Sequence, residues 1–308
     1  MRRRSWTATA AVPAGAVLTC LALAACGPGP VPMGAATGTP APTGGAATTG
    51  TGAEAAGTAS GTTAGTGAVR TPTPVGGAGT ATGPGALRGR VVVIDPGHDG
   101  GNGTHAAQIN RLVDIGNGVK ACDTAGTETN AGYAESAFTF DVSTRLAALL
   151  RAAGATVVLT RHDDRGVGPC ISERASIGNR AHAAAALSIH GDGAPAAGYG
   201  FHVIVPKSIG RNEAIVAPSR QLGVRVRDAF RAGTGEPLST YIGGSGALVA
   251  RDDLGGLNLS TVPKVFIECG NMRNAADAAR MTSPAWRQRA AVALAAGITR
   301  FLTADSPD

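Results

Sequence analysis

The sequence predicts a single α/β domain built on a twisted, mostly parallel sheet that is flanked by helices on both faces. Three short apolar runs predict buried strands, and each leads into a histidine or an acid: 91–98 (VVVIDPGH), 186–190 (ALSIH) and 265–268 (VFIE). Segments with helical spacing separate these runs, and such alternation is typical of a parallel sheet covered on both sides. Open α/β sheets place their sites where the strands end.

The elements are expected in a regular order. After a first strand at 90–95, a Gly-rich polar stretch at 100–132 is too long for an ordinary connection, so we expect a functional loop or lid that restricts access to a cleft. Apolar residues one turn apart predict a helix at 134–153, which Gly154 would end. The remaining elements are a strand at 156–160, a helix after Ser172 that runs to about 183, strands at 186–190 and 200–205, a helix at 212–231, strands at 247–250 and 264–268, and a helix at 284–302.

The N-terminus predicts export. Three arginines at positions 2–4 precede an apolar stretch that runs to about residue 25, which is the pattern of a secretory signal. The stretch ends in Leu-Ala-Ala-Cys, with Gly27 after Cys26, and this resembles the bacterial lipobox. We therefore expect a signal peptide at 1–25 and a lipidated Cys26 that anchors the protein to the outer face of the plasma membrane. An ordinary secretory cleavage site is the alternative.

Composition divides the rest of the chain. Residues 26–86 are rich in Gly, Ala, Thr and Pro, with Glu54 and Arg70 as the only charges, so this segment is expected to be a disordered tether. Residues 87–304 are long enough for one catalytic domain, expected to act as a monomer. The formal net charge of +6 favours association with anionic wall polymers. The sequence contains no basic stripe with interleaved aromatic residues, so nucleic-acid binding is not expected.

The strand ends carry the residues of a zinc hydrolase. A catalytic zinc site uses three ligands from histidines and carboxylates and leaves a fourth position for water. His98 and His190 are the predicted imidazole ligands. The third ligand is expected at the start of the 134–153 helix, where Glu135 lies, because a helix N-terminus stabilises an anion. Glu128 and Asp141 are nearby carboxylates that remain alternatives.

Glu268 is the predicted general base. It ends an apolar strand, where an acid is costly to bury without a partner or a task. A carboxylate beside a zinc site can take a proton from water during attack on a carbonyl. Once protonated, it can deliver that proton to the departing amine.

Four segments together resemble one family of enzymes. Ile94-Asp95-Pro96-Gly97-His98, Glu135, Ser188-Ile189-His190 and Phe266-Ile267-Glu268 are similar to the zinc-dependent N-acetylmuramoyl-L-alanine amidases that carry a DPGHGG-type first motif. The resemblance implies one Zn²⁺ held by His98, Glu135 and His190, with Glu268 catalytic. It also implies a peptidoglycan or muramoyl-peptide substrate, cleaved between muramic acid and L-alanine. The 100–132 stretch and a cysteine pair resemble the actinobacterial, mycobacterial-type branch.

The chain departs from the family pattern at two places. Asp99 stands where glycine is more usual, and 191–194 (GDGA) lacks the usual Asn after the second histidine, so we expect altered substrate contacts. Two rival functions differ in class. One is a wall-binding lipoprotein without catalysis on the same scaffold, and the other is a zinc peptidase or deacetylase that acts elsewhere in the wall. Release of stem peptides with an L-alanine N-terminus distinguishes an amidase from a deacetylase, which releases acetate.

The cysteines predict one disulfide. Cys122 and Cys170 lie on two loops of an exported domain, where oxidising conditions permit the bond. Their pairing would tie the long loop to the domain, whereas two free thiols are the alternative. Cys269 is expected to be buried and inert. Among other polar residues, Arg174 and Asn179 are interpreted as helix-surface residues, with a place at the site as the alternative. His202 is interpreted as a residue that packs beside the sheet, with a place in the cleft as the alternative.

Overall fold

A computed structural model of the chain describes residues 83–304. The predicted signal peptide, Cys26 and the tether up to residue 82 lie outside the described residues. The secondary-structure elements, in chain order, are β1 (Val91–Pro96), η1 (Asn102–Thr104), α1 (Ala106–Ile109), β2 (Leu112–Asp114), β3 (Val119–Ala121), α2 (Glu135–Ala152), β4 (Thr156–Leu159), α3 (Ile171–Arg180), β5 (Ala185–Asp192), β6 (His202–Pro206), α4 (Glu213–Thr234), η2 (Gly244–Gly246), β7 (Leu248–Arg251), α5 (Gly255–Asn258), β8 (Lys264–Asn271), α6 (Ala275–Met281) and α7 (Pro284–Thr303).

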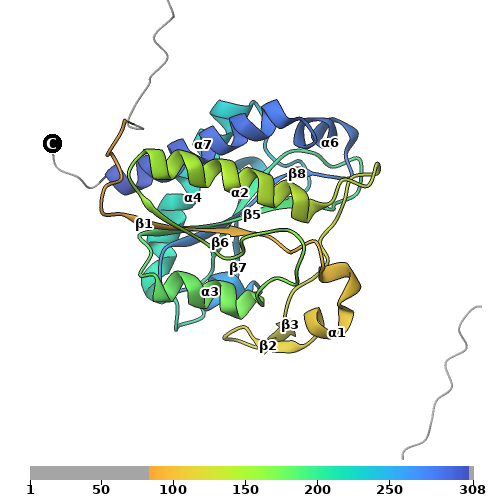
Figure 1. The fold of residues 1–308 in the computed structure, drawn as a ribbon, viewed down its shortest axis with the longest axis horizontal. Helices are drawn as coiled ribbons and strands as arrows, with labels where there is room; N and C mark the ends of the chain where they lie inside the picture. The colour runs from red at the N-terminus through yellow and green to blue at the C-terminus, as the bar shows by residue number, and fades with distance from the viewer. Residues whose placement is uncertain (1–82, 305–308) are drawn as a thin grey trace, which may run out of the picture. The chain divides into compact units, whose positions relative to one another are not determined.

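Six of the strands form one sheet in the order β4-β1-β5-β8-β6-β7. The first four run parallel to one another, whereas β6 runs antiparallel to β8 and β7 runs parallel to β6. Helices cover both faces, with α2 and α7 above the sheet and α3 below it (Figure 1). The predicted fold class, a mostly parallel sheet between helices, is therefore confirmed.

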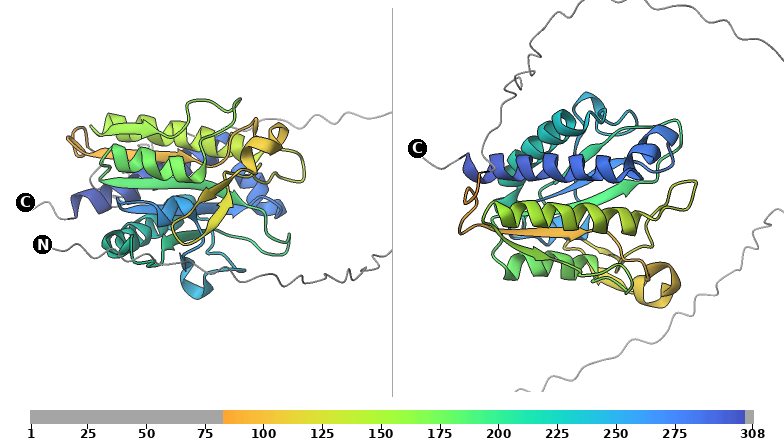
Figure 2. Two further views of the ribbon diagram at one scale, coloured as in Figure 1. Left: turned by 90° about the horizontal axis from the view of Figure 1, so that it is seen from below. Right: turned by 45° about the horizontal axis from the view of Figure 1, so that its top comes forward.

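The larger core lies between the sheet and α2, α4 and α7. It contains Phe138 and Leu146 from α2, Phe230 from α4 and Trp286 from α7, each buried completely or nearly so. Helices α2 and α7 run side by side over this face (Figure 2). On the opposite face α3 covers a smaller cluster around Val93. Most of the apolar burial that stabilises the sheet is therefore on the α2 face.

The α3 face of the sheet is polar where β1, β5 and β8 end. Successive side chains of a strand point to opposite faces. Ile189 and Ile267 point into the larger core, so their neighbours His190 and Glu268 point to the α3 face. Helix α3 covers the other part of this face, and a cavity opens over the strand ends. The alternation that buries the isoleucines thus delivers the candidate site residues to one place.

The main difference from the predicted elements is the 100–132 stretch. It is not a plain loop, because it contains η1, α1 and a β2–β3 hairpin, which lie beside α3 (Figure 1). These elements are three or four residues long, and Leu112 and Val119 are exposed in the hairpin, so no periodic apolar pattern marks them. The short helices α5 and α6 were missed for the same reason of length. Helix α3 begins at Ile171 rather than after Ser172.

Within residues 83–304, every helix is too short or too polar to cross a membrane.

Candidate active site

His98 emerges from β1 through a tight turn. Its backbone has φ 57°, a left-handed conformation that few non-glycine residues adopt. Gly97 is required before it, because a Cβ at that position would collide with the His190 ring. The backbone N–H of Gly97 donates to Ile189 O at 3.0 Å, which ties the turn to β5. Strained backbone of this kind is held by its surroundings and is common at functional sites.

Glu135 is the first residue of α2 and is 3 % exposed. Its Oε2 accepts from the backbone N–H of Thr127 at 2.9 Å, and its Oε1 accepts from that of Gly191 at 3.1 Å. These bonds fix both carboxylate oxygens in the cleft. Of the alternatives, Glu128 is exposed, and Asp141 forms ion pairs with Arg145 and Arg287 along the helices.

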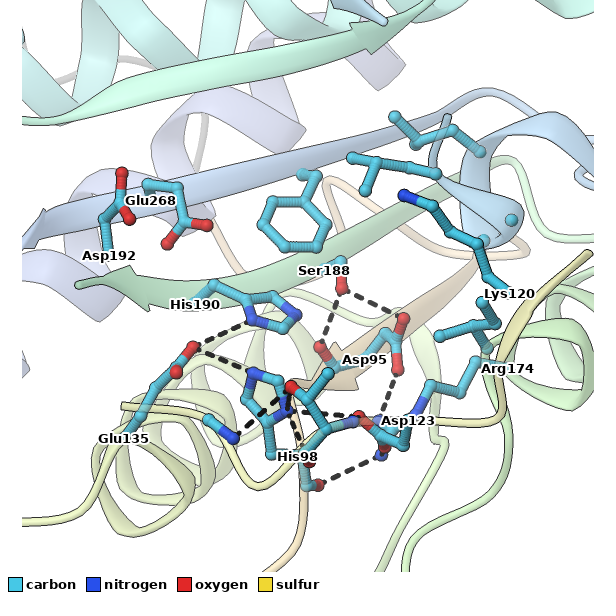
Figure 3. A pocket seen from close by; sticks show the side chains of 18 of the residues that line it. Asp95, His98, Lys120, Asp123, Glu135, Arg174, Ser188, His190, Asp192 and Glu268 are labelled. Atoms are coloured by element: carbon cyan, nitrogen blue, oxygen red, sulfur yellow. Dashed lines mark hydrogen bonds and ion pairs between the residues drawn. The ribbon is translucent and has the colours of Figure 1, made fainter. Parts of the chain in front are cut away.

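His190 completes a three-residue cluster. Its Nδ1 lies 2.9 Å from Glu135 Oε1, and its ring stacks on Phe266 with centroids 3.9 Å apart. His98 Nε2 lies 3.2 Å from the same carboxylate oxygen. One candidate ligand atom from each of these three residues lies within 4.8 Å of the others, and Figure 3 shows both imidazoles turned toward Glu135. The arrangement can hold a metal ion.

The electrostatics of the cluster favour added positive charge. Burial favours the neutral form of His98, but Glu135 and Asp123 together outweigh burial and raise the pKa of His98 to about 10. Burial alone would raise the pKa of Glu135, yet the charge of His98 and the hydrogen bond from His190 hold that pKa well below its usual range. Burial lowers the pKa of His190. A carboxylate held ionised between two imidazoles, one of them easily kept neutral, fits a divalent cation.

Glu268 lies beside this cluster. It is opposite His190 in the parallel register of β5 and β8, and both side chains lie on the α3 face. Its Oε2 is buried without a hydrogen-bond partner among the described residues. Burial raises the pKa of Glu268 well above its usual value, and the charges of Glu135 and Asp192 add to this. A carboxyl group in this state can exchange protons with a water or substrate in the cleft.

The cleft is a cavity of about 570 Å³. The three-residue cluster and Glu268 line one part of it, and Figure 3 shows Lys120, which pairs with Asp253, at the opposite side. Gly126 and Thr127 pass close over Glu135, and Thr127 also contacts Gly193. The cavity is large enough for a segment of sugar and peptide rather than a single small group.

Comparisons with known proteins identify the family. The Amidase_3 family model, described as N-acetylmuramoyl-L-alanine amidase, matches residues 92–300. An N-acetylmuramoyl-L-alanine amidase of Mycobacterium tuberculosis is 44 % identical over 220 residues, which cover 71 % of this chain and 89 % of that protein. The chain belongs to the N-acetylmuramoyl-L-alanine amidase family.

Solved structures agree with this assignment. The amidase Ami1 of Mycobacterium smegmatis superposes with a TM-score of 0.67 and 43 % identity, covering 71 % of this chain and 99 % of that one. Ami1 of Mycobacterium abscessus superposes with a TM-score of 0.66 and 43 % identity, covering 70 % of this chain and 100 % of that one. An amidase of Nostoc punctiforme, at 24 % identity, TM-score 0.52 and coverages of 70 % and 97 %, shares the fold. The predicted resemblance to the actinobacterial branch is thus confirmed, and the chain is a hydrolase of this family.

The amidase contains a buried charged network that sequence reasoning missed. Arg174, interpreted from the sequence as a surface residue, is 4 % exposed, and its guanidinium bonds to Asp95 and Asp123 beneath the site. Lys264 also pairs with Asp95. A signal was present, because Ile171, Arg174, Ala175 and Gly178 lie on one helical stripe that faces the sheet. An arginine on such a stripe is buried with its partners.

The remaining predicted residues have varied positions. Asn179 bonds to Leu259 O and to the backbone N–H of Thr261, so its role is structural. Asp192 lines the cavity, whereas Asp99 is buried and is not among the residues that line it. His202 is buried on β6 opposite Glu268, and burial lowers its pKa to about 4.

The predicted disulfide between Cys122 and Cys170 is present. It joins the segment after β3 to the start of α3. Cys269 is free and fully buried, as expected, and burial raises the pKa of its thiol well above the usual value, which disfavours the reactive thiolate.

Proposed function

We propose that this amidase uses a single zinc ion to hydrolyse the amide bond between N-acetylmuramic acid and L-alanine in peptidoglycan. The observation that carries the proposal is the convergence of His98, Glu135 and His190 beside the buried carboxyl group of Glu268. Two imidazoles and one carboxylate are the donor set of many catalytic zinc sites, and three protein ligands leave a position open. Family membership supports a peptidoglycan substrate and an extracellular or cell-envelope location.

Each residue has a chemical role. His98, Glu135 and His190 would hold the ion, which when bound lowers the pKa of a coordinated water and polarises a carbonyl group. Glu268 accepts a proton from the water that attacks the amide carbon. As the carbon–nitrogen bond breaks, Glu268 donates that proton to the nitrogen of the departing L-alanine. Burial raises the pKa of Glu268, and this supports the proposal because a carboxylate with a raised pKa is a stronger acceptor for the proton of the attacking water.

The walls of the cleft support a substrate with two chemically different parts. Phe266 and the His190 ring give an apolar wall next to the metal cluster. Lys120 and Asp253, which form an ion pair 3.0 Å long, give a charged wall at the far end. We propose that the lactyl–alanine junction lies at the metal cluster and that the charged remainder of the substrate extends toward Lys120.

Product analysis tests the reaction. The protein is incubated with a muramoyl-peptide, with and without prior removal of metal by a chelator. The proposal predicts intact stem peptide with a free L-alanine N-terminus, loss of cleavage after chelation and recovery with added Zn²⁺. Release of acetate instead would show a deacetylase, and cleavage that persists in the fully metal-free protein would contradict the zinc assignment.

The anchoring is proposed on the sequence alone. We propose that Cys26 is lipidated after removal of residues 1–25 and that the monomeric domain acts from the outer face of the plasma membrane. Mass spectrometry of the protein expressed with its full N-terminus is expected to show an acylated Cys26, and Cys26→Ala is expected to release the protein from the membrane fraction. An unmodified N-terminus would indicate ordinary secretion.

A further inference from the structure

We propose that Asp123 and Arg174 are positioning residues for His98, and that the Cys122–Cys170 disulfide holds the two segments that carry them at the separation that zinc binding requires. The proposal rests on the metal site proposed above. It assigns a role in metal retention to a disulfide that does not itself touch the cluster.

The ring of His98 is fixed from behind by the segment that follows Cys122. His98 Nδ1 lies 3.1 Å from Asp123 Oδ1 and 3.0 Å from the backbone O of Thr124. Both are acceptors, so Nδ1 carries a hydrogen, and Nε2, which faces Glu135, is the nitrogen that would bind the metal ion. A carboxylate behind a ligating histidine sets the tautomer and ring orientation and makes the ligand more basic.

Arg174 holds both His98 and its carboxylate partner. Its Nη2 donates to Asp123 Oδ2 and to the backbone O of His98, each at 3.0 Å. One planar guanidinium therefore fixes the ring acceptor and the left-handed backbone of the same ligand. A left-handed backbone conformation at a non-glycine residue costs on the order of 1–3 kcal/mol of conformational free energy. His98 therefore needs such external support to keep this conformation.

Arg174 is in turn fixed to the sheet. Its Nη1 donates to Asp95 Oδ1 at 2.9 Å and to the backbone O of Pro96 at 2.6 Å. Asp95 accepts from Lys264 Nζ at 2.9 Å and from Ser188 Oγ at 3.0 Å. The bonds form a continuous buried path from β8 and β5 through Arg174 to the ring of His98. Figure 3 shows the part of this path that runs from Ser188 through Asp95 to His98.

The disulfide joins the two segments on which this path depends. Cys122 immediately precedes Asp123, and Cys170 is the N-cap residue of α3, four positions before Arg174. The cysteines are 48 residues apart in the chain. A backbone bond from Ile171 N–H to Cys122 O, 2.8 Å long, joins the same two segments, and the bond from Arg174 N–H to Cys170 O, 2.9 Å long, fixes Arg174 to the first turn of α3. The covalent link therefore restrains the distance between Asp123 and the helix that carries Arg174.

Reduction is expected to loosen the metal site. A water-soluble phosphine, which binds zinc weakly, converts the disulfide into two thiols with two electrons and two protons. The phosphine becomes its oxide and takes the oxygen from water. The residues around His98 are unchanged by this reaction, but the segment that supplies Asp123 and Thr124 loses its covalent tie to α3.

The test measures zinc affinity by competition with a chromophoric chelator. Asp123→Asn keeps the shape of the side chain but loses the charge that Arg174 pairs with, so zinc is expected to bind roughly tenfold more weakly or worse. Phosphine-reduced protein and the Cys122→Ser/Cys170→Ser variant are expected to bind zinc several-fold more weakly. Asp141→Asn, which removes a carboxylate from a helix-surface ion pair, is the matched control and is expected to leave affinity unchanged.

Two further readouts separate positioning from general loss of structure. Thermal unfolding of each metal-free variant shows whether it is folded at the temperature of the titration. In the cobalt-substituted protein, a displaced His98 is expected to shift the visible absorption bands, which a uniform loss of stability would not do. If Asp123→Asn proves unfolded, the reduced wild type still tests the proposal.

The outcomes are distinct. Zinc affinity and cobalt spectra that are unchanged in the reduced protein and in folded Asp123→Asn would overturn the positioning role and leave the proposed function intact. An equal loss in Asp141→Asn would also overturn it, because the effect would not be specific to His98. Wild-type protein that binds no zinc would overturn the proposed metal site and this inference with it.

Discussion

The two sides of the cleft differ in how completely their buried polar groups are paired. On the His98 side, Asp95, Asp123 and Arg174 satisfy one another at 2.9 to 3.0 Å. On the Glu268 side, Glu268 Oε2, His202 Nδ1 and the Tyr241 hydroxyl are buried without a hydrogen-bond partner among residues 83–304. His202 is opposite Glu268 in the sheet, and its ring makes an edge contact with Tyr241 at 5.9 Å.

This difference matches the two tasks proposed for His98 and Glu268. A metal ligand must hold one orientation through every turnover, and a fully paired network supplies that rigidity. A proton-transfer group must instead bond to water, substrate and leaving group in turn, so its hydrogen-bonding capacity has to remain free in the protein alone. The same buried environment therefore fixes His98 and leaves Glu268 available.

The largest expected effect comes from removing one of the proposed metal ligands. His190→Ala is expected to remove zinc and to reduce the turnover rate by more than the roughly 100-fold that loss of an outer partner costs. Elemental analysis after dialysis, together with the rate of muramoyl-peptide cleavage, measures both. The control is His105→Ala, which alters an exposed histidine outside the cavity and should keep metal and rate. Stoichiometric zinc in His190→Ala would contradict the ligand assignment.

A second prediction concerns pH and the buried carboxyl group of Glu236, which lies away from the cleft and has one oxygen, Oε2, without a hydrogen-bond partner among residues 83–304. Burial raises the pKa of Glu236 from 4.5 to about 8, Asp277 adds to this, and Arg280 opposes it. Because the folded state holds this proton more tightly, the stability it contributes is complete below about pH 4.5 and is lost as pH rises through about 8. Glu236→Gln is expected to remove a decline of a few kcal/mol across that window, since one pKa unit corresponds to about 1.4 kcal/mol.

Denaturant unfolding of both proteins at several pH values measures this. Parallel pH profiles for wild type and Glu236→Gln would show that the Glu236 carboxyl group is not held protonated in the folded protein.

The smallest effect compares one hydroxyl from each side of the cleft. Thr160 Oγ1 donates to Asp95 Oδ1 at 2.7 Å on the paired side, so Thr160→Val is expected to lower the free energy of unfolding by about 2 kcal/mol. Tyr241→Phe removes a buried hydroxyl that has no hydrogen-bond partner among the described residues, so this substitution is expected to raise the free energy of unfolding by about 1 kcal/mol. Denaturant unfolding at neutral pH gives both values. Effects of the same sign would remove the distinction between the two sides.

Candidate site residues at the ends of strands were easier to predict from the sequence than those elsewhere in the fold. His98, His190 and Glu268 follow apolar runs, and parallel register alone brings such ends together. Glu135 depended on the family resemblance, because a helix start does not specify which nearby carboxylate turns inward. Asp123 had no local signal, since its contact with His98 exists only after the 100–132 stretch folds back and the disulfide closes. The burial of Arg174 was missed because the interpretation considered the charge of the arginine but not its position on the buried face of α3.

The fold was predicted on the same basis. Long strands and helices carry apolar periodicity, and the predicted bounds of these elements lie within three residues of the observed ends. The β2–β3 hairpin carries exposed apolar residues and is held by tertiary contacts such as the Lys120–Asp253 ion pair. Elements of this kind are defined by their neighbours in space, which the chain order does not reveal.

The most direct test of the contrast between the two sides is a parallel measurement of zinc content and amide hydrolysis in wild type, Glu268→Gln and Glu135→Gln. We predict stoichiometric zinc in wild type and Glu268→Gln, with turnover in Glu268→Gln lower by roughly 10²- to 10⁴-fold, and little zinc in Glu135→Gln. Loss of zinc in Glu268→Gln, or full activity in that variant, would contradict the separation of metal binding from proton transfer on which the account depends.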